Sequence, residues 1–142
     1  MAIRLDHVIV PSRDPVASAR LLAGLLDVPW EKTRGHFTPV YVNETLTLDF
    51  ASRDDAGMRA DLREGTHHYC FHVSEGEFDA ILGRIETAGI AYRSEPGGPT
   101  DRQINRRLGG KNLYWQDDDG HLWEILTVSY ARADSPLLTP TG

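Results

Sequence analysis

Apolar and polar residues alternate at the start of the chain and then change to a helical spacing. Residues 3–10 alternate with a period of two, which predicts a strand with His7 on the same face as its aliphatic neighbours. Asp14 followed by Pro15 is typical of a helix start, and the helix is expected to run to about Leu26. Its predicted apolar stripe consists of Ala17, Leu21, Leu22, Leu25 and Leu26.

Short strands are predicted after this helix. Residues 30–33 and 37–42 are candidates, and residues 45–50 alternate cleanly, with Asp49 on the face opposite the aliphatic residues. Residues 52–65 are charged and show no apolar periodicity, so we interpret them as a connector.

The same order of elements then begins again. Residues 66–73 predict a strand, Ser74 and Glu77 have the spacing of a capping box, and the helix that follows is expected to end at Gly89. A short strand is expected at residues 90–93. The alternation of the first of these strands places on one face Thr66, His68, Cys70 and His72.

Residues 111–128 are predicted to form two strands joined by an acidic turn. Residues 117–120 are Asp-Asp-Asp-Gly, and these residue types tolerate the left-handed backbone of a tight turn. Glu124 lies in the middle of the second strand, where a carboxylate is costly to bury unless a cation meets it. Residues 94–110 are predicted to be a loop rich in Gly and Arg, and residues 131–142 a flexible tail.

The repeat of strand, helix and strands divides the chain into two similar modules. They cover about residues 1–60 and 65–130, and together they are expected to form one domain. His7 and His68 occupy equivalent places, early in the first strand of each module.

Composition excludes several classes of protein. The chain has 142 residues and a net charge of −6 at pH 7, which argues against a general nucleic-acid binder. No apolar run is long enough for a membrane span, and the pattern of a signal peptide is not recognisable. The single cysteine, Cys70, excludes an internal disulfide and suits the cytoplasm.

Three phrases of the sequence together resemble the vicinal oxygen chelate superfamily, which includes glyoxalase I, fosfomycin-resistance thiol transferases, extradiol dioxygenases and bleomycin-resistance proteins. The phrases are LDHVIV, THHYCFHV and DDDGHLWEIL, and the last resembles the superfamily's D-x-D-G-x-x-x-E signature. The resemblance covers residues 3–127. It implies an α+β fold in which two βαβββ modules form a half-barrel around a metal cup.

The resemblance implies that His7, His68 and Glu124 bind one divalent ion: Fe, Mn, Zn, Ni or Co. His67 stands beside His68, but the strand register turns it to the opposite face. Two imidazoles and one carboxylate leave open positions, to which a substrate chelates through two neighbouring oxygens. In the absence of a metal role, each histidine would be a hydrogen-bonded core residue and Glu124 would face water at a sheet edge.

Further residues are assigned around the metal. Asp49 is a candidate fourth ligand or general base, and otherwise a solvated carboxylate. Tyr114, ten residues before Glu124, is a candidate donor to a developing oxyanion, and otherwise a core residue. His72 is a candidate acid–base group, and Cys70 is expected to be a small filler on the wall of the substrate site.

The arginine-rich loop offers a second way to hold a substrate. Its cations are Arg102, Arg106, Arg107 and Lys111. Either they clamp an anionic substrate beside the metal, or they form an ordinary solvated surface.

The predicted function is that of a divalent-metal-dependent enzyme of the glyoxalase or dioxygenase type, acting by dioxygenase, isomerase or lyase chemistry on a small oxygenated molecule. By analogy with small superfamily members, a homodimer is expected to share its sites, with His7 from one chain and His68 and Glu124 from the other. Ile9 stands where the fosfomycin enzymes carry Thr, which argues against a fosfomycin-specific activity. The alternatives are a bleomycin-resistance-like dimer that sequesters a drug without catalysis, and a metal-bearing scaffold without turnover.

Overall fold

The computed structural model describes residues 3–132, so almost all of the predicted tail at residues 131–142 lies outside the described residues. The chain divides into two compact units, Met1–His67 and His68–Gly142. Each unit holds one helix and one mixed sheet, which confirms the predicted α+β class.

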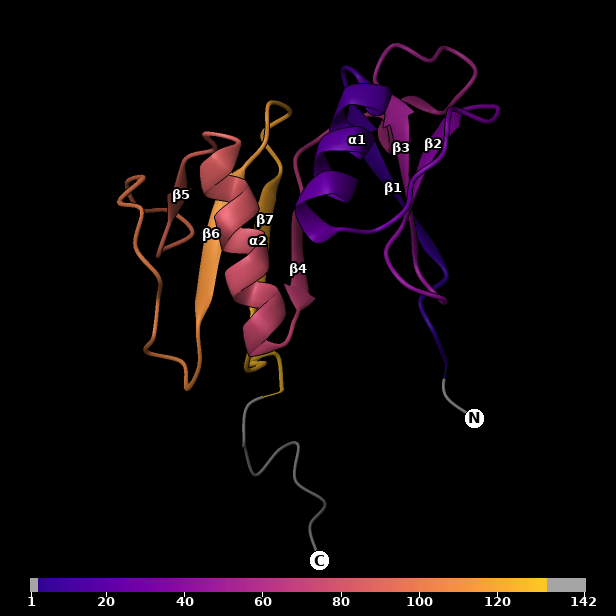
Figure 1. Cartoon of the computed structure of the whole chain (residues 1–142). Helices are drawn as coiled ribbons and strands as arrows, with labels where there is room; N and C mark the ends of the chain where they lie inside the picture. The colour runs from indigo at the N-terminus through magenta and orange to yellow at the C-terminus, as the bar shows by residue number, and fades with distance from the viewer. Residues whose placement is uncertain (1–2, 133–142) are drawn as a thin grey trace, which may run out of the picture. The chain divides into compact units, whose positions relative to one another are not determined.

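The first unit has a sheet of three strands with a helix packed against all of them (Figure 1). Its elements are β1 (His7–Ser12), α1 (Pro15–Leu26), β2 (Phe37–Tyr41) and β3 (Thr47–Ser52). The strand order is β1-β3-β2, with β1 parallel and β2 antiparallel to β3. The predicted connector contains a short 3-10 helix, Ala60–Leu62.

Two details of the first unit differ from the prediction. The first strand begins at His7 rather than at residue 3, and it continues through Pro11, because β1 is an edge strand in which a missing N–H is tolerated. The strand predicted at residues 30–33 is reduced to an isolated bridge between Trp30 and Val40.

The helix start of α1 is confirmed, but its buried stripe is not the predicted one. The side chain of Asp14 accepts a hydrogen bond from the backbone N–H of Ala17 at 3.2 Å. Of the predicted stripe, Leu21 is 46% exposed and Ala17 is exposed as well, and the residues buried on α1 are Ala19, Leu22, Ala23 and Leu25. The small side chains at 19 and 23 turn toward the sheet because they let the helix approach it closely, which leaves Leu21 outside.

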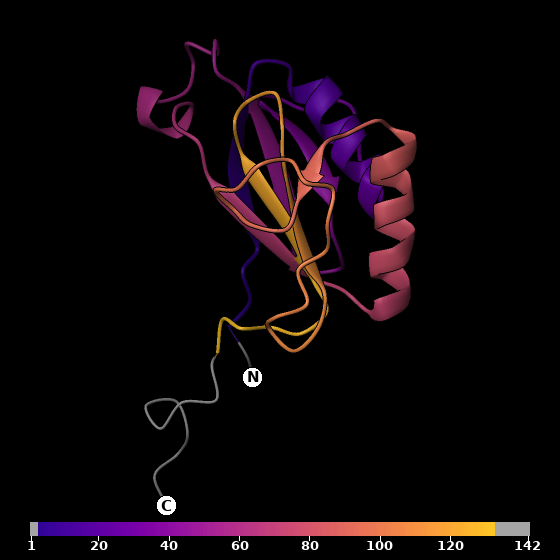
Figure 2. The ribbon, with the colours of Figure 1, turned by 90° about the vertical axis from the view of Figure 1, so that its left-hand side faces the viewer.

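The second unit has a sheet of four strands (Figures 1 and 2). Its elements are β4 (His68–His72), α2 (Glu75–Thr87), β5 (Tyr92–Arg93), β6 (Asn112–Gln116) and β7 (Leu122–Leu126). The strand order is β4-β7-β6-β5, with β4 parallel to β7 and the other pairs antiparallel.

The start of α2 follows the predicted capping box. The hydroxyl of Ser74 accepts from the backbone N–H of Glu77 at 3.1 Å, and the carboxylate of Glu77 accepts from the backbone N–H of Ser74 at 2.8 Å. Lys111, just before β6, pairs with Glu75 at 2.8 Å and Asp79 at 2.7 Å on this helix. These contacts join the first turns of α2 to its sheet.

The two faces of the second sheet differ in chemistry. One face carries an aromatic stack that consists of Tyr69, Phe71, Trp115 and Trp123, with Trp123 stacked on the other three rings. Strand alternation places the ionisable residues on the opposite face, which is called the polar face below. Its members are His68, Cys70, His72, Tyr114 and Glu124.

Candidate metal centre

Glu124 lies in the middle of β7, and its side chain is fully buried. The acidic turn before the strand fixes its register. The carboxylate of Asp117 accepts hydrogen bonds from the backbone N–H of His121 and from the indole N–H of Trp123, both at 2.9 Å. Gly120 takes the left-handed conformation, with φ of 87°, that closes the turn. The phrase DDDGHLWEIL therefore has a structural role: its hydrogen bonds hold the turn and the start of β7, and so place Glu124 on the polar face.

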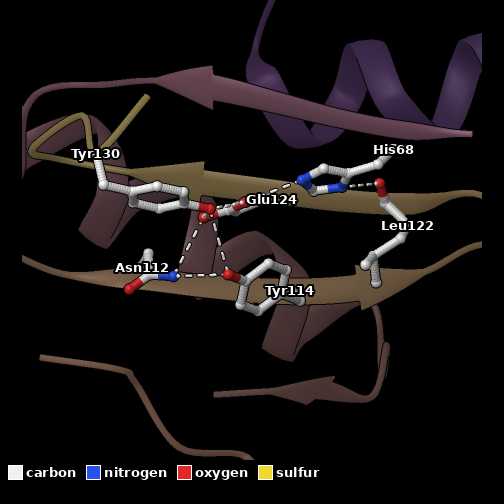
Figure 3. Close-up of polar contacts among 6 residues, drawn as sticks. All are labelled: His68, Asn112, Tyr114, Leu122, Glu124 and Tyr130. Atoms are coloured by element: carbon white, nitrogen blue, oxygen red, sulfur yellow. Dashed lines mark hydrogen bonds and ion pairs between the residues drawn. The ribbon is translucent and has the colours of Figure 1, made fainter. Parts of the chain in front are cut away.

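The side chains of Tyr130, Asn112 and His68 contact the carboxylate of Glu124 (Figure 3). The hydroxyl of Tyr130 lies 2.7 Å from both carboxylate oxygens and donates to them. The side-chain amide of Asn112 donates to Oε2 at 3.1 Å. On the other side, Nε2 of His68 lies 3.1 Å from Oε1.

The hydrogen bond on the far side of the His68 ring decides which nitrogen carries the proton. Nδ1 lies 2.8 Å from the backbone carbonyl oxygen of Leu122, and a carbonyl only accepts, so Nδ1 carries a hydrogen (Figure 3). In the neutral ring, Nε2 then presents a lone pair to Oε1 of Glu124. Two acceptors facing each other at 3.1 Å require a proton or a cation between them.

The spacing of these two atoms fits a metal ion. Two ligands at right angles around an ion, with bonds of about 2.1 Å, are about 3.0 Å apart. The separation between Nε2 of His68 and Oε1 of Glu124 is 3.1 Å. A backbone carbonyl that fixes the tautomer of a ligating histidine is the usual outer partner of such a site.

Tyr114 lies directly beside Glu124 in the register of β6 and β7. Its hydroxyl accepts a hydrogen bond from Asn112 at 3.2 Å and lies 3.4 Å from the hydroxyl of Tyr130. Burial raises the pKa of Tyr114, so the phenol keeps its proton.

His72 and Cys70 share the polar face with His68, as predicted from strand alternation. His72 is engaged through Nε2, which donates to the backbone carbonyl of Thr127 at 3.0 Å. Cys70 pairs with Glu124 in the strand register, and burial together with that carboxylate raises the pKa of the thiol to about 12. Cys70 is therefore a neutral thiol beside the carboxylate, and an acid–base role for His72 stays a prediction.

His7 is the first residue of β1 and belongs to the first unit. Its Nδ1 donates to the carboxylate of Asp6 at 2.7 Å, and this hydrogen bond raises the pKa of His7. The arrangement again leaves Nε2 as the nitrogen with a lone pair once the ring is neutral. Asp49, on β3, adds negative charge near His7, and partial burial raises the pKa of Asp49.

A pocket of about 270 Å³ opens beside this pair in the first unit. Its walls come from all three strands, and its charged members include His7, Asp49 and Arg34. Phe37 and Tyr41 of β2 supply aromatic surface. The face of the first sheet that carries His7 therefore has a hollow lined by both charged and aromatic side chains.

The two units place an imidazole and a carboxylate at the same register positions. His7 pairs with Thr47, and Asp49 follows two residues later on the same strand. His68 pairs with Leu122, and Glu124 follows two residues later. Asp49 is therefore the counterpart of Glu124 in the repeat.

The predicted ligands are brought together only in part within each unit. His68 and Glu124 meet in the second unit, whereas among residues 3–132 no group of three or more His, Cys, Asp or Glu side chains forms a metal-binding cluster. The convergence of His7 with the other two ligands stays a prediction.

The cations of the arginine-rich loop are partly occupied. Arg107 pairs with Glu95, and Lys111 is held by two carboxylates of α2. Arg102 has a positive φ of 54°, and both Arg102 and Arg106 are exposed. The predicted clamp through Arg102 and Arg106 stays a prediction.

Sequence reasoning missed two residues of this centre, Asn112 and Tyr130. Asn112 precedes Tyr114 by two positions in β6, so strand alternation alone places it on the polar face. Tyr130 follows the end of β7, and no periodicity connects it to Glu124. Only the path of the chain after β7 brings its hydroxyl back to the carboxylate.

Comparison with known proteins gives the following relatives. Oxidase ChaP-H2 is 37% identical, with 92% of this chain and 98% of that chain covered and a TM-score of 0.80. The metallothiol transferase FosB of Shouchella clausii (strain KSM-K16) is 34% identical over 74 residues, which are 52% of this chain and 47% of that relative. A fosfomycin resistance protein, FosX, from Listeria monocytogenes, in a structure complexed with Mn(II) and a sulfate ion, shares the fold at 17% identity. Its TM-score is 0.64, over 92% of this chain and 94% of that chain.

Within the described residues, no helix is long and apolar enough to span a bilayer.

No family model matches the chain, and the assignment rests on these relatives. ChaP-H2, which is named an oxidase, matches over 98% of its own length at 37% identity, and FosB is named a metallothiol transferase. The chain belongs to the vicinal oxygen chelate superfamily.

Proposed function

We propose that the protein is a divalent-metal-dependent enzyme that acts on a small oxygenated molecule bound to the metal through two neighbouring oxygens. Oxidation is the favoured reaction class, since ChaP-H2, which covers 92% of this chain at 37% identity, is named an oxidase. FosB matches over about half of its own length, and Ile9 replaces the Thr of the fosfomycin enzymes, so a fosfomycin-specific reaction is not favoured.

The observation that carries the proposal is the pair of facing acceptors in the second unit. The carbonyl of Leu122 holds the Nδ1 hydrogen of His68, and Nε2 faces a fully buried carboxylate of Glu124 at 3.1 Å. A divalent ion satisfies both atoms at once, and their separation matches two adjacent ligands of such an ion. A buried carboxylate without a cation lowers the free energy of unfolding, and binding of the ion recovers this loss.

The chain's own residues fit this chemistry. His68, Glu124 and His7 hold the ion, with Asp49 as a further carboxylate on the first unit, and Fe, Mn, Zn, Ni or Co suits this ligand set. When bound, the ion supplies Lewis acidity to chelated substrate oxygens and a redox centre for dioxygen. Tyr114 donates its hydroxyl hydrogen to a developing oxyanion, because Asn112 already occupies an acceptor site on the same oxygen.

The remaining ligand, His7, completes the site from the first unit of a second copy of the chain. A homodimer with shared sites, in the cytoplasm, is part of this proposal. One domain built from two modules, with about residues 131–142 as its tail, is part of it as well.

Metal analysis with matched variants tests the proposal. The chain, purified without chelator and dialysed against each divalent ion, is expected to hold one ion, and His68→Ala is expected to lose it. His67→Ala is the matched control, because His67 is exposed and precedes β4, whereas His68 is the first residue of that strand. A wild-type protein that takes up no ion, and instead binds an aromatic drug tightly, would replace this proposal by the sequestering dimer.

A further inference from the structure

One row of side chains crosses the whole polar face of the second sheet. Cys70 pairs with Glu124, Glu124 pairs with Tyr114, and Tyr114 pairs with Arg93 on the outer strand β5. Directly paired residues of neighbouring strands point to the same face. The row therefore runs from the thiol through the candidate metal ligand and the phenol to a guanidinium.

Arg93 differs from the other cations of this unit because part of its donor capacity is buried and unused. Its Nε is a buried atom that has no hydrogen-bond partner within residues 3–132. Lys111 and Arg107, in contrast, are paired with carboxylates. A buried donor without a partner is costly, so natural proteins seldom keep one that no ligand, ion or water ever meets.

A second orphaned atom lies on the same face. Oδ1 of Asn112 is also buried without a partner within residues 3–132. Asn112 stands two positions from Tyr114 on β6 and contacts both Tyr114 and Glu124 through its amide nitrogen. Within residues 3–132, both orphaned side-chain atoms therefore belong to residues that flank Tyr114 on the polar face, Asn112 on the same strand and Arg93 opposite it on β5.

We propose that Arg93 binds an anionic group of the substrate, so that the enzyme selects small molecules that carry a carboxylate besides their chelating oxygens. The proposal rests on the proposed function and adds the substrate class. Neighbouring strands lie about 4.8 Å apart, so the backbones at Glu124 and Arg93 are separated by about 10 Å across two spacings. With both side chains on the same face of the sheet, this distance suits a single-ring or similarly compact molecule with oxygens at one end and the anion at the other.

Arg93 suits this role better than the exposed arginines of the loop. A planar guanidinium pairs with a carboxylate through two parallel hydrogen bonds, and Nε is one of the donors that make such a pair. The strand β5 fixes the backbone of Arg93 beside Tyr114, whereas Arg102 and Arg106 lie in the loop outside the named strands. Positions on a strand hold a binding group in place at a lower entropic cost than positions on a loop.

A matched pair of probes tests the proposal. The probes are 3,4-dihydroxybenzoate and its methyl ester, which share the chelating oxygens and differ in the charge at the other end. Binding of each to the metal-loaded full chain is measured by calorimetry for wild type, Arg93→Gln, Arg93→Lys and the control Arg20→Gln, at an exposed position of α1. Thermal melting of each variant shows whether the fold is kept.

The wild type is expected to bind the acid about tenfold more tightly than the ester, since one charge-assisted pair is at stake. Arg93→Gln is expected to abolish this preference and leave ester binding unchanged, while Arg93→Lys restores part of the preference and Arg20→Gln keeps all of it. Equal binding of acid and ester by the wild type, or a preference that survives Arg93→Gln, overturns the role of Arg93. Metal analysis separates the two claims, because a wild-type chain that binds no divalent ion overturns the proposed function itself and this inference with it.

Discussion

The hydroxyl of Tyr130 donates its hydrogen to the carboxylate of Glu124. Removal of this hydroxyl is the most informative single change in the centre. It lies 2.7 Å from both carboxylate oxygens, and one of these, Oε1, is also the oxygen that faces His68. A metal ion held by His68 and Glu124 therefore competes with this hydroxyl for the same oxygen. Tyr130→Phe keeps the ring and removes only the competitor.

The expected magnitude follows from one charge-assisted hydrogen bond to a buried carboxylate. Because a single hydrogen is shared between two oxygens, the contact counts once and contributes about 1.5 kcal/mol to the free energy of unfolding of the metal-free protein. For a chain of this size, Tm is then lower by about 5 °C. If metal binding displaces the hydroxyl, the variant no longer loses that bond on loading, and its metal affinity rises by about tenfold.

The assay measures both quantities on the same protein. Chelator-treated wild type and Tyr130→Phe are melted without metal, and Zn(II) or Co(II) is then titrated in competition with a chromophoric chelator. Tyr92→Phe is the control, since its hydroxyl makes only a 3.4 Å contact with Glu86. Tyr92 pairs with Trp115 and so lies on the aromatic face of the same sheet. A lower Tm combined with unchanged or weaker metal affinity would show that Tyr130 stays on Glu124 in the loaded state, and would refute the competition.

Two further predictions concern positions in the loops. Gly110→Ala places a Cβ 2.5 Å from Oγ1 of Thr127, so we expect a loss of about 1–3 kcal/mol in urea unfolding, whereas Gly97→Ala, in open space in the same loop, stays within about 0.5 kcal/mol. The hydrogen bond from His36 lowers the pKa of Asp55, so its stabilising effect is present above 3.8, the ordinary value, and is lost as the pH falls through the lower folded value. Melting scans between pH 6 and pH 2 are expected to show a smaller acid-induced loss for Asp55→Asn, and equal losses in both proteins would contradict this assignment.

Local patterns in the sequence predict most of the fold. The capping box at Ser74, the helix start at Asp14 and the period-two strands depend on contacts between residues close in the chain, and the structure has each of these elements, although β1 begins at His7 rather than at residue 3. The buried face of α1 was predicted wrongly at Leu21, because the choice of face depends on how closely a helix approaches its sheet. That distance is set by residues far apart in the sequence, and no local pattern contains it.

The centre was predictable to the extent that strand alternation determines it. Alternation and the acidic turn place Glu124, Tyr114 and His68 on one face, as the register of β4, β6 and β7 shows. Tyr130 and Arg93 could not be found in this way. Tyr130 reaches Glu124 from beyond the end of β7, and Arg93 stands on a strand of two residues, too short to show a period.

The strand registers of the two units reveal a difference between their carboxylates that the repeat in the sequence does not show. Each unit places one histidine and, two residues past its strand partner, one carboxylate, yet the two carboxylates are in different states. Glu124 is fully buried among hydrogen-bond donors, while Asp49 is partly exposed beside the pocket of the first unit. The free energy cost of burying a negative charge is therefore paid mainly at Glu124 in the second unit, and a bound cation would stabilise that unit most.

It follows that metal loading should protect the backbone amides of β7 from hydrogen exchange more than those of β3. Equal protection of both strands would mean that Asp49 binds the ion as strongly as Glu124 does.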